Sequence, residues 1–169
     1  MEKIQCPEFR RAFFEIEKSE LSRNKFEEKG WVSVVVVGMP DLLHQEWLEE
    51  AAKAMGSKEF VYYIFSGASN ENCKIIETEV SKGELSVVLF ENLGDIFVTD
   101  KKNRFVMYQE VAGDYFILAG PIEFIKQAYR ASFKTAKLDY HGWIDGQVLG
   151  SPQGKRIMEK IWEKYAIQY

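Results

Sequence analysis

The stretch IFVTDKKNRFVMYQEVAGDYFILAG, residues 96–120, decides the fold class. It contains three β-prone runs, 96–99, 105–109 and 115–119, which are separated by the short turn-type segments DKKN and AGD. Antiparallel strands can be joined by connections this short, whereas parallel strands need a long crossover. The stretch therefore predicts a meander of three antiparallel strands.

The same pattern extends toward the N-terminus. Runs 60–65, 74–80 and 85–90 are rich in β-branched and aromatic residues and are separated by polar segments, so we predict three more strands in the meander. Residues 31–37 contain four consecutive valines, which is typical of a strand buried on both faces.

Helical periodicity surrounds the strands on both sides. The predicted helices are 8–28, with a break in 19–24 as an alternative, 41–55, 122–137 and 153–167, while 138–151 is expected to be irregular. We therefore predict one domain, residues 1–169, of the α+β class. Its mainly antiparallel β-meander sheet should pack on N- and C-terminal helices in two layers.

The composition excludes several functions. The net charge is −4 at pH 7 and no basic stripe is present, which argues against a nucleic-acid partner. The longest apolar run is Val34–Val37, far too short to span a membrane. The N-terminal residues MEKIQ have no apolar run after their charges, so we expect no signal peptide.

The chain has two cysteines, Cys6 and Cys73, far apart in the sequence. A secreted domain of this kind would usually carry more, so we interpret them as free thiols in a reducing compartment. This interpretation predicts a cytoplasmic protein.

Motifs that carry catalysis or bind cofactors are missing from the sequence. It contains no phosphate-binding glycine loop and no G-x-S-x-G nucleophile elbow. The His-Glu-x-x-His metal motif fails at His44, because Leu48 occupies the second histidine position. We therefore expect no cofactor, no metal and no enzymatic activity, and interpret His44 as a solvated helix residue.

The segment around His141 is the densest cluster of chemically active side chains. Asp139, Tyr140, Trp143 and Asp145 lie within four residues of His141, in a segment predicted as a glycine-containing loop. Such a loop can line a site when a scaffold holds it. The alternative is a structural loop in which Trp143 fills the core and the charged groups face water.

The leading hypothesis is a non-catalytic protein-binding protein. In its most concrete form, it is a bacterial immunity or inhibitor protein that neutralises a basic toxin or nuclease through an acidic, aromatic surface. The predicted contact residues are Glu77, Glu79, Asp95, Asp100, Tyr140, His141, Trp143 and Asp145.

Two alternatives belong to other classes. The first is a small-ligand-binding protein or enzyme with a pocket between sheet and helices, using Asp139, His141 and Asp145, with Tyr62, Tyr108 and Tyr115 as lining. The second is a homodimer, in which strand 60–65 lies at a sheet edge and pairs with a second copy.

Overall fold

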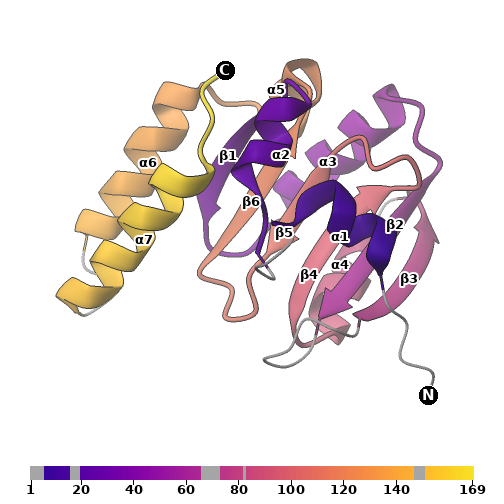
Figure 1. Cartoon of the computed structure of the whole chain (residues 1–169), viewed down its shortest axis with the longest axis horizontal. Helices are drawn as coiled ribbons and strands as arrows, with labels where there is room; N and C mark the ends of the chain where they lie inside the picture. Colours follow the sequence, from indigo (N-terminus) through magenta and orange to yellow (C-terminus); the bar gives the residue numbers. More distant parts are fainter. Residues whose placement is uncertain (1–5, 16–19, 66–72, 82, 147–150) are drawn as a thin grey trace.

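Six strands form one sheet with the order β1-β6-β5-β4-β2-β3 (Figure 1). The computed structural model describes residues 6–15, 20–65, 73–81, 83–146 and 151–169. The strands are β1 (Val32–Val37), β2 (Glu59–Phe65), β3 (Cys73–Glu79), β4 (Asp95–Asp100), β5 (Val106–Gln109) and β6 (Tyr115–Gly120). All neighbouring strands are antiparallel, which confirms the predicted class of sheet.

The meander predicted from residues 96–120 is present as β4, β5 and β6. Tyr108 lies opposite Phe97 on one side and opposite Ile117 on the other. The chain reverses between β5 and β6 through Gly113, whose φ of +75° lies in the left-handed region that favours glycine. Strand β1 then pairs with β6, so the valine-rich run forms the end of the sheet beyond the meander.

Residues 85–90, which we predicted as a strand, form part of helix α4 (Glu84–Glu91). Short apolar runs do not distinguish a strand from a buried helix. Leu85, Val88 and Leu89 are buried at helical spacing. Strand β2 pairs with both β3 and β4, so the chain passes from β3 back to β4 through α4 and not through a further strand. The prediction was wrong because long-range pairing, rather than the local pattern, decided the structure.

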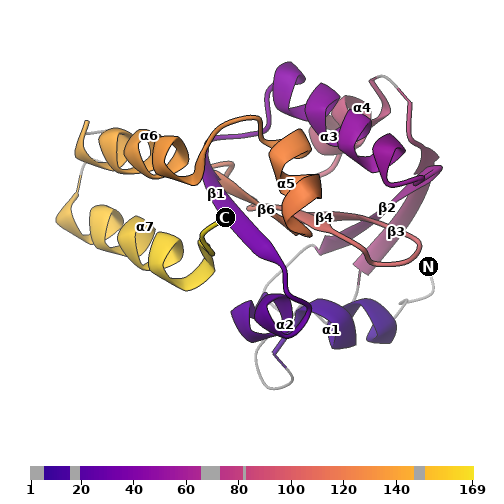
Figure 2. The ribbon, with the colours of Figure 1, turned by 90° about the horizontal axis from the view of Figure 1, so that it is seen from above.

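Helices cover the sheet as Figure 2 shows. Helices α3 (Leu42–Ala54), α4 and α5 (Ile122–Ala128) lie on one face and form, with the sheet, a two-layer α+β arrangement. Helices α1 (Pro7–Phe13) and α2 (Arg23–Glu28) lie against part of the opposite face.

Helix α3 begins and ends where the sequence predicts. The Asp41 side chain accepts a hydrogen bond of 2.8 Å from the backbone N–H of His44, which caps the helix N-terminus. Leu48, Ala51 and Ala52 face the core. Gly56 follows the helix with a φ of +75°, the conformation in which glycine commonly ends helices.

The N-terminal segment is two helices rather than the single helix 8–28. Ser22 accepts a hydrogen bond from the backbone N–H of Lys25 and starts α2 separately, while an isolated bridge joins Phe14 to Leu21. The break between the two helices overlaps the range 19–24 that we gave as an alternative. Residues 16–19 lie outside the described part. Phe9 of α1 stacks on Tyr63 of the sheet at 4.0 Å between ring centroids.

The C-terminal region is more helical than predicted. The expected helix 122–137 is divided into α5 and α6 (Phe133–Asp145), because Ser132 caps a new start. Residues 138–145, predicted as irregular, therefore belong to α6, and residues 147–150 lie outside the described part. Helix α7 (Pro152–Tyr165) starts within one residue of the predicted start at 153, and the Ser151 side chain caps it. None of the described helices is long and apolar enough to cross a bilayer.

The two edges of the sheet are β1 and β3. The C-terminal tail covers part of β1, where Ser33 and Ile167 exchange two backbone hydrogen bonds of 3.2 and 3.0 Å. Strand β2 lies inside the sheet, so the homodimer predicted through an edge at 60–65 is wrong in that form. A dimer through another surface stays untested.

Cys6 and Cys73 form a disulfide that ties the segment before α1 to the start of β3. Their Cα atoms are 6.7 Å apart and both side chains are buried. The prediction of two free thiols was therefore wrong. Sequence separation carried no information about this pairing, which follows from α1 packing over the end of the sheet where β3 begins.

Candidate functional site

The four carboxylates predicted to form one contact surface lie in different environments. Glu77 and Glu79 are exposed on the edge strand β3, and Lys101 Nζ lies 3.0 Å from Glu77. Asp95 and Asp100 occupy opposite ends of β4. Because side chains alternate along a strand, these two also face opposite sides of the sheet. The structure therefore does not gather the four into one acidic patch.

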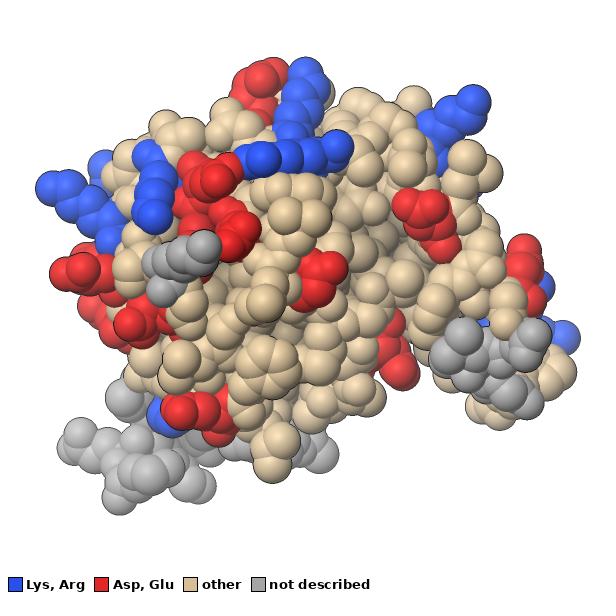
Figure 3. Space-filling model, turned by 180° about the vertical axis from the view of Figure 1, so that it is seen from behind, with Lys and Arg blue, Asp and Glu red and all other residues tan. Residues whose placement is uncertain are grey.

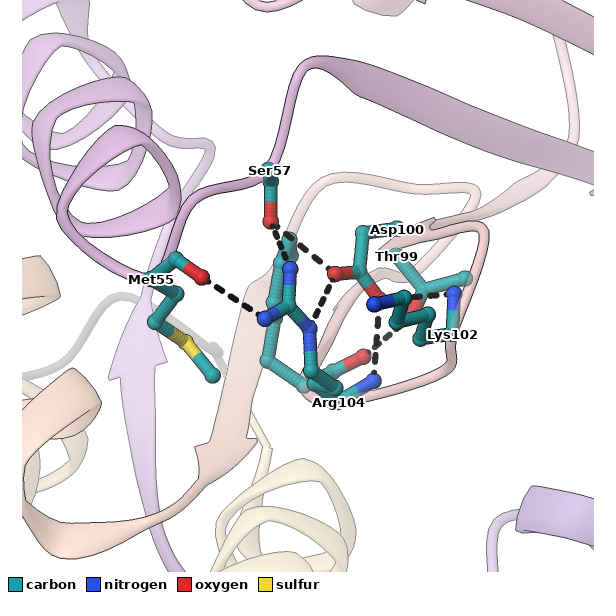
Figure 4. Close-up of polar contacts among 7 residues, drawn as sticks. Met55, Ser57, Thr99, Asp100, Lys102 and Arg104 are labelled. Carbon is teal, nitrogen blue, oxygen red and sulfur yellow. Dashed lines mark hydrogen bonds and ion pairs between the residues drawn. The ribbon is translucent and has the colours of Figure 1, made fainter.

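Asp100 is a structural group inside the protein (Figure 4). Its carboxylate accepts hydrogen bonds from Arg104 Nε at 2.6 Å and Ser57 Oγ at 2.9 Å. The backbone N–H groups of Lys102 and Arg104 also donate to it, at 3.1 and 3.0 Å. The same guanidinium donates to the Met55 carbonyl at 2.6 Å, which ties the β4–β5 turn to the end of α3.

The environment of Asp100 decides its charge and excludes its predicted role. Burial raises the pKa of Asp100, but the hydrogen bonds from Arg104 and Ser57 outweigh burial and hold the pKa below its ordinary value. Only 3% of Asp100 is exposed. Our assignment of Asp100 to a contact surface is corrected accordingly.

The segment Tyr140–Asp145 is helical and not a loop. Tyr140 is 1% exposed and donates a hydrogen bond of 2.9 Å to the Met158 carbonyl of α7, so it cannot contact a partner in this fold. The His141 ring packs against Trp162, and Trp143 is partly buried. Asp145 is exposed, and the hydrogen bond from Lys155 at 2.5 Å lowers its pKa. Tyr140, His141 and Asp145 thus join α6 to α7.

Replacing Tyr140 with Phe should lower the free energy of unfolding by about 1 kcal/mol, because one buried hydrogen bond between α6 and α7 is lost while the ring stays. Chemical denaturation measures this change. Partner affinity should not change, and a selective loss of binding by a stable Tyr140→Phe protein would restore this residue to the contact surface.

The histidines and other potential ligands do not gather around a metal position. Among the described residues, no group of three or more His, Cys, Asp or Glu side chains could hold a metal ion. His44 Nδ1 lies 2.7 Å from the Asp41 carboxylate, and hydrogen bonds from His44 lower the pKa of Asp41. His44 thus takes part in capping α3.

A cavity of about 370 Å³ lies between α7 and the sheet. Two of the tyrosines predicted to line a pocket, Tyr108 and Tyr115, line it, whereas Tyr62, Asp139, His141 and Asp145 do not. The lining residues are Glu20, Leu21, Asp95, Phe97, Tyr108, Tyr115, Ile157, Lys160, Ile161, Lys164 and Tyr165.

The polar floor of the cavity is built around Asp95. Its Oδ1 accepts hydrogen bonds from Tyr108 Oη at 3.2 Å and from the Val111 backbone at 3.0 Å. Burial raises the pKa of Asp95 above its ordinary value, although both hydrogen bonds act in the opposite direction. Burial also raises the pKa of the Tyr108 and Tyr115 hydroxyls, so both tyrosines are neutral hydrogen-bonding groups.

Large apolar side chains are exposed at one end of the molecule, which we call the apolar end. It comprises seven of the ten exposed large hydrophobic residues in the described part of the chain: Met39, Leu42, Leu43, Val87, Phe90, Leu93 and Val111. The exposed fractions reach 88% at Leu93, 71% at Leu42 and 69% at Phe90. Single exposed hydrophobic residues are common, whereas large contiguous apolar patches are typical of interaction surfaces.

Specific contacts hold the parts of the apolar end together. The start of α3 meets α4 through a hydrogen bond between Gln45 and Ser86. The β1–α3 connection meets the β5–β6 turn, because the Gly38 N–H donates to the Asp114 carbonyl at 2.8 Å. That turn meets the start of β4 through the hydrogen bond from the Val111 N–H to Asp95. Three segments far apart in the sequence thus converge.

Acidic side chains predominate in the segments that form the apolar end. The segments 38–52, 83–100 and 105–125, which form it and the adjoining elements, carry four, four and three carboxylates respectively and no Lys or Arg. Seen from behind in Figure 3, the face with α3, α4 and α5 has a wide uncharged area with acidic groups around it, while Lys and Arg gather mainly along its upper margin. At the border with β3, Lys74 donates a hydrogen bond to Asn92.

Sequence reasoning missed the apolar end for an identifiable reason. Val87 and Phe90 lay in a run that we predicted as a strand, so the sequence did not show that they share the exposed side of a helix. The absence of cations from three long segments was visible in the sequence. The three segments form one surface without cations only because the fold brings them together.

Comparisons of the chain with protein-family models, with curated proteins and with solved structures found no match.

Proposed function

We propose that this chain is a non-catalytic protein-binding protein that docks its partner at the apolar end. The observation that carries the proposal is the gathering of seven large, exposed apolar side chains where the surrounding segments contain carboxylates and no Lys or Arg. In its most concrete form, the protein is a bacterial immunity or inhibitor protein that neutralises a basic toxin or nuclease.

The arrangement supplies the two components that a specific interface needs. Phe90 and the leucines of α3 and the α4–β4 connection offer apolar anchors, whose burial provides most of the affinity at a typical interface centre. Asp41, Glu91 and Asp114 are exposed around them and supply negative potential. Such a field accelerates encounter with a cationic partner and disfavours acidic ones.

The expected partner therefore has an apolar contact area surrounded by Lys and Arg. Enzymes that act on nucleic acids fit this description, because their substrate grooves are cationic in order to bind phosphates. An acidic protein that covers such a groove competes with the substrate for the same charges. This contact surface replaces most of the one we predicted. Of the predicted residues, only Asp95 and Asp100 belong to the three segments, and Asp100 is buried at the far end of β4.

Site-specific crosslinking tests the location of the interface. A photoreactive phenylalanine analogue at position 90 should crosslink one basic protein in the native host, whereas the same analogue at Leu138 should not. Leu138 is the matched control because it is 64% exposed but lies on α6, away from the apolar end. Equal crosslinking from both positions, or an acidic partner at position 90, contradicts the proposal.

Affinity measurements with the purified, crosslinked partner then test the energetics. Phe90→Ser should weaken binding by about 30-fold or more, the size of an interface hot spot, while Leu138→Ser should leave it unchanged. Affinity for the wild type should fall as salt is raised, because the rim charges become screened. If position 90 crosslinks to a second copy of this chain and light scattering gives a dimer mass, the apolar end is a self-association surface and the inhibitor proposal fails.

A further inference from the structure

The cavity beneath α7 lies on the other side of the sheet from α3 and α4 and has the composition of a small-molecule site. Its volume of about 370 Å³ falls within the range of small-ligand pockets. Leu21, Ile157 and Ile161 contribute apolar wall, and the rings of Phe97 and Tyr108, stacked 4.7 Å apart, contribute aromatic surface. A flat apolar ring is the kind of group that such walls accommodate.

The Asp95 carboxylate in this cavity has an environment that suits the binding of a cation. Asp95 Oδ1 is engaged by Tyr108 and Val111, whereas Asp95 Oδ2 accepts no hydrogen bond from the described residues. The carboxylate is half-buried beside aromatic rings. A ligand ammonium at this position would form a charge-assisted hydrogen bond in a partly desolvated site, and the ring faces would favour the same charge.

The rim of the cavity carries the opposite charge. Lys160 and Lys164 line it from α7, one turn apart on the same helix face as Ile157 and Ile161. Lys164 is paired with Glu20, and Lys160 is exposed at the opening. The cavity thus combines one acid in the floor, apolar walls and a cation at the mouth.

From this layout we infer that the cavity binds a small zwitterionic aromatic molecule of the aromatic amino acid class, with its ammonium at Asp95, its ring against Phe97 and Tyr108, and its carboxylate toward Lys160. The inference does not rest on the apolar end, because none of the seven exposed apolar residues that define that end lines the cavity. A test of ligand binding in the cavity is therefore independent of a test of partner binding at the apolar end.

A ligand series on the unmodified protein tests each part of the inference. Isothermal titration with L-tryptophan, tryptamine and indole-3-propionate separates the ammonium from the carboxylate. L-Tryptophan should bind most tightly, tryptamine should bind more weakly, and indole-3-propionate should lose about tenfold or more relative to L-tryptophan. No saturable binding by any of the three, or tightest binding by indole-3-propionate, overturns the inference.

Variants locate the site. Asp95→Asn should weaken L-tryptophan binding by about tenfold or more and remove the preference for tryptamine over indole-3-propionate, while Asp139→Asn, an exposed acid on α6, should have no effect. Binding to the wild type should weaken as acid protonates Asp95, and this pH dependence should be absent from Asp95→Asn. If Asp95→Asn does not fold, the ligand series and the pH dependence of the wild type test the inference without it. Unchanged affinity for L-tryptophan in a folded Asp95→Asn protein rejects the site.

Discussion

Replacing Arg104 with Met should lower the free energy of unfolding by about 3–5 kcal/mol at neutral pH, the cost of leaving a buried charge without its partner. The Asp100 side chain is 4% exposed, and Arg104 supplies the cation beside it. The substitution also removes the hydrogen bonds from the guanidinium to Met55 and Ser57, which join α3 to the β4–β5 turn. Urea denaturation followed by circular dichroism measures the change.

Lys101→Met is the matched control for this prediction. Lys101 is the neighbour of Asp100 in the same turn and forms ion pairs with Glu59 and Glu77, but its side chain is 51% exposed. Exposed pairs contribute between zero and about 1 kcal/mol, so this variant should unfold close to the wild type. Equal effects of the two substitutions would show that burial of Asp100 does not control the stability of the turn.

The effect of Arg104→Met should depend on pH. In the wild type the pKa of Asp100 is lowered below its ordinary value of 3.8 in spite of burial, by hydrogen bonds from Arg104 and Ser57. A depressed carboxyl pKa stabilises the folded state at pH values above the unfolded pKa, and this contribution is lost as pH falls through the folded pKa. The difference between wild type and variant should therefore be largest near neutrality and shrink below about pH 4.

Reduction of the disulfide between Cys6 and Cys73 should lower the free energy of unfolding by about 4 kcal/mol, because the bond closes a long loop in the unfolded chain. The two residues are 67 positions apart in the sequence. Denaturation with and without a phosphine reductant measures the effect, and the double variant Cys6→Ser, Cys73→Ser should not respond to the reductant.

The state of the two cysteines also indicates the compartment in which the protein functions. Our expectation of a cytoplasmic protein depended on free thiols, and the disulfide removes that support. Two thiols that react with a thiol reagent in the unreduced, denatured protein would contradict the disulfide and restore the expectation. One cystine with no reactive thiol would favour an oxidising compartment.

The sequence predicted those elements whose signals are local. The meander 96–120 and the starts of α3 and α7, each within one residue of the predicted start at 41 and 153, follow from turn residues, caps and periodicity within a few positions. Residues 85–90 failed because an apolar run of that length suits a strand or a helix equally. The division of 122–145 into α5 and α6 failed because strong helix periodicity on both sides hid the cap at Ser132.

The candidate sites were predictable only in part, since each depends on residues that meet across the fold. Tyr108 and Tyr115 line one cavity, because strand alternation places both on the same face of neighbouring strands, whereas the other residues predicted for that pocket lie elsewhere. Asp95 was assigned to an outer surface, yet it lines that same cavity together with α7. Asp100 was misplaced because its sequence neighbours are polar, and polarity along the chain does not report burial.

The sequence by itself determined the antiparallel sheet, the starts of α3, α5 and α7 and the scarcity of cations in three long segments, because backbone preferences and composition act over short distances. The tertiary structure alone decided that Asp100 is enclosed by Arg104, that Cys6 reaches Cys73, and that those three segments converge on one exposed apolar end. These outcomes depend on which surfaces the sheet order brings together, and strand pairing over long sequence distances sets that order.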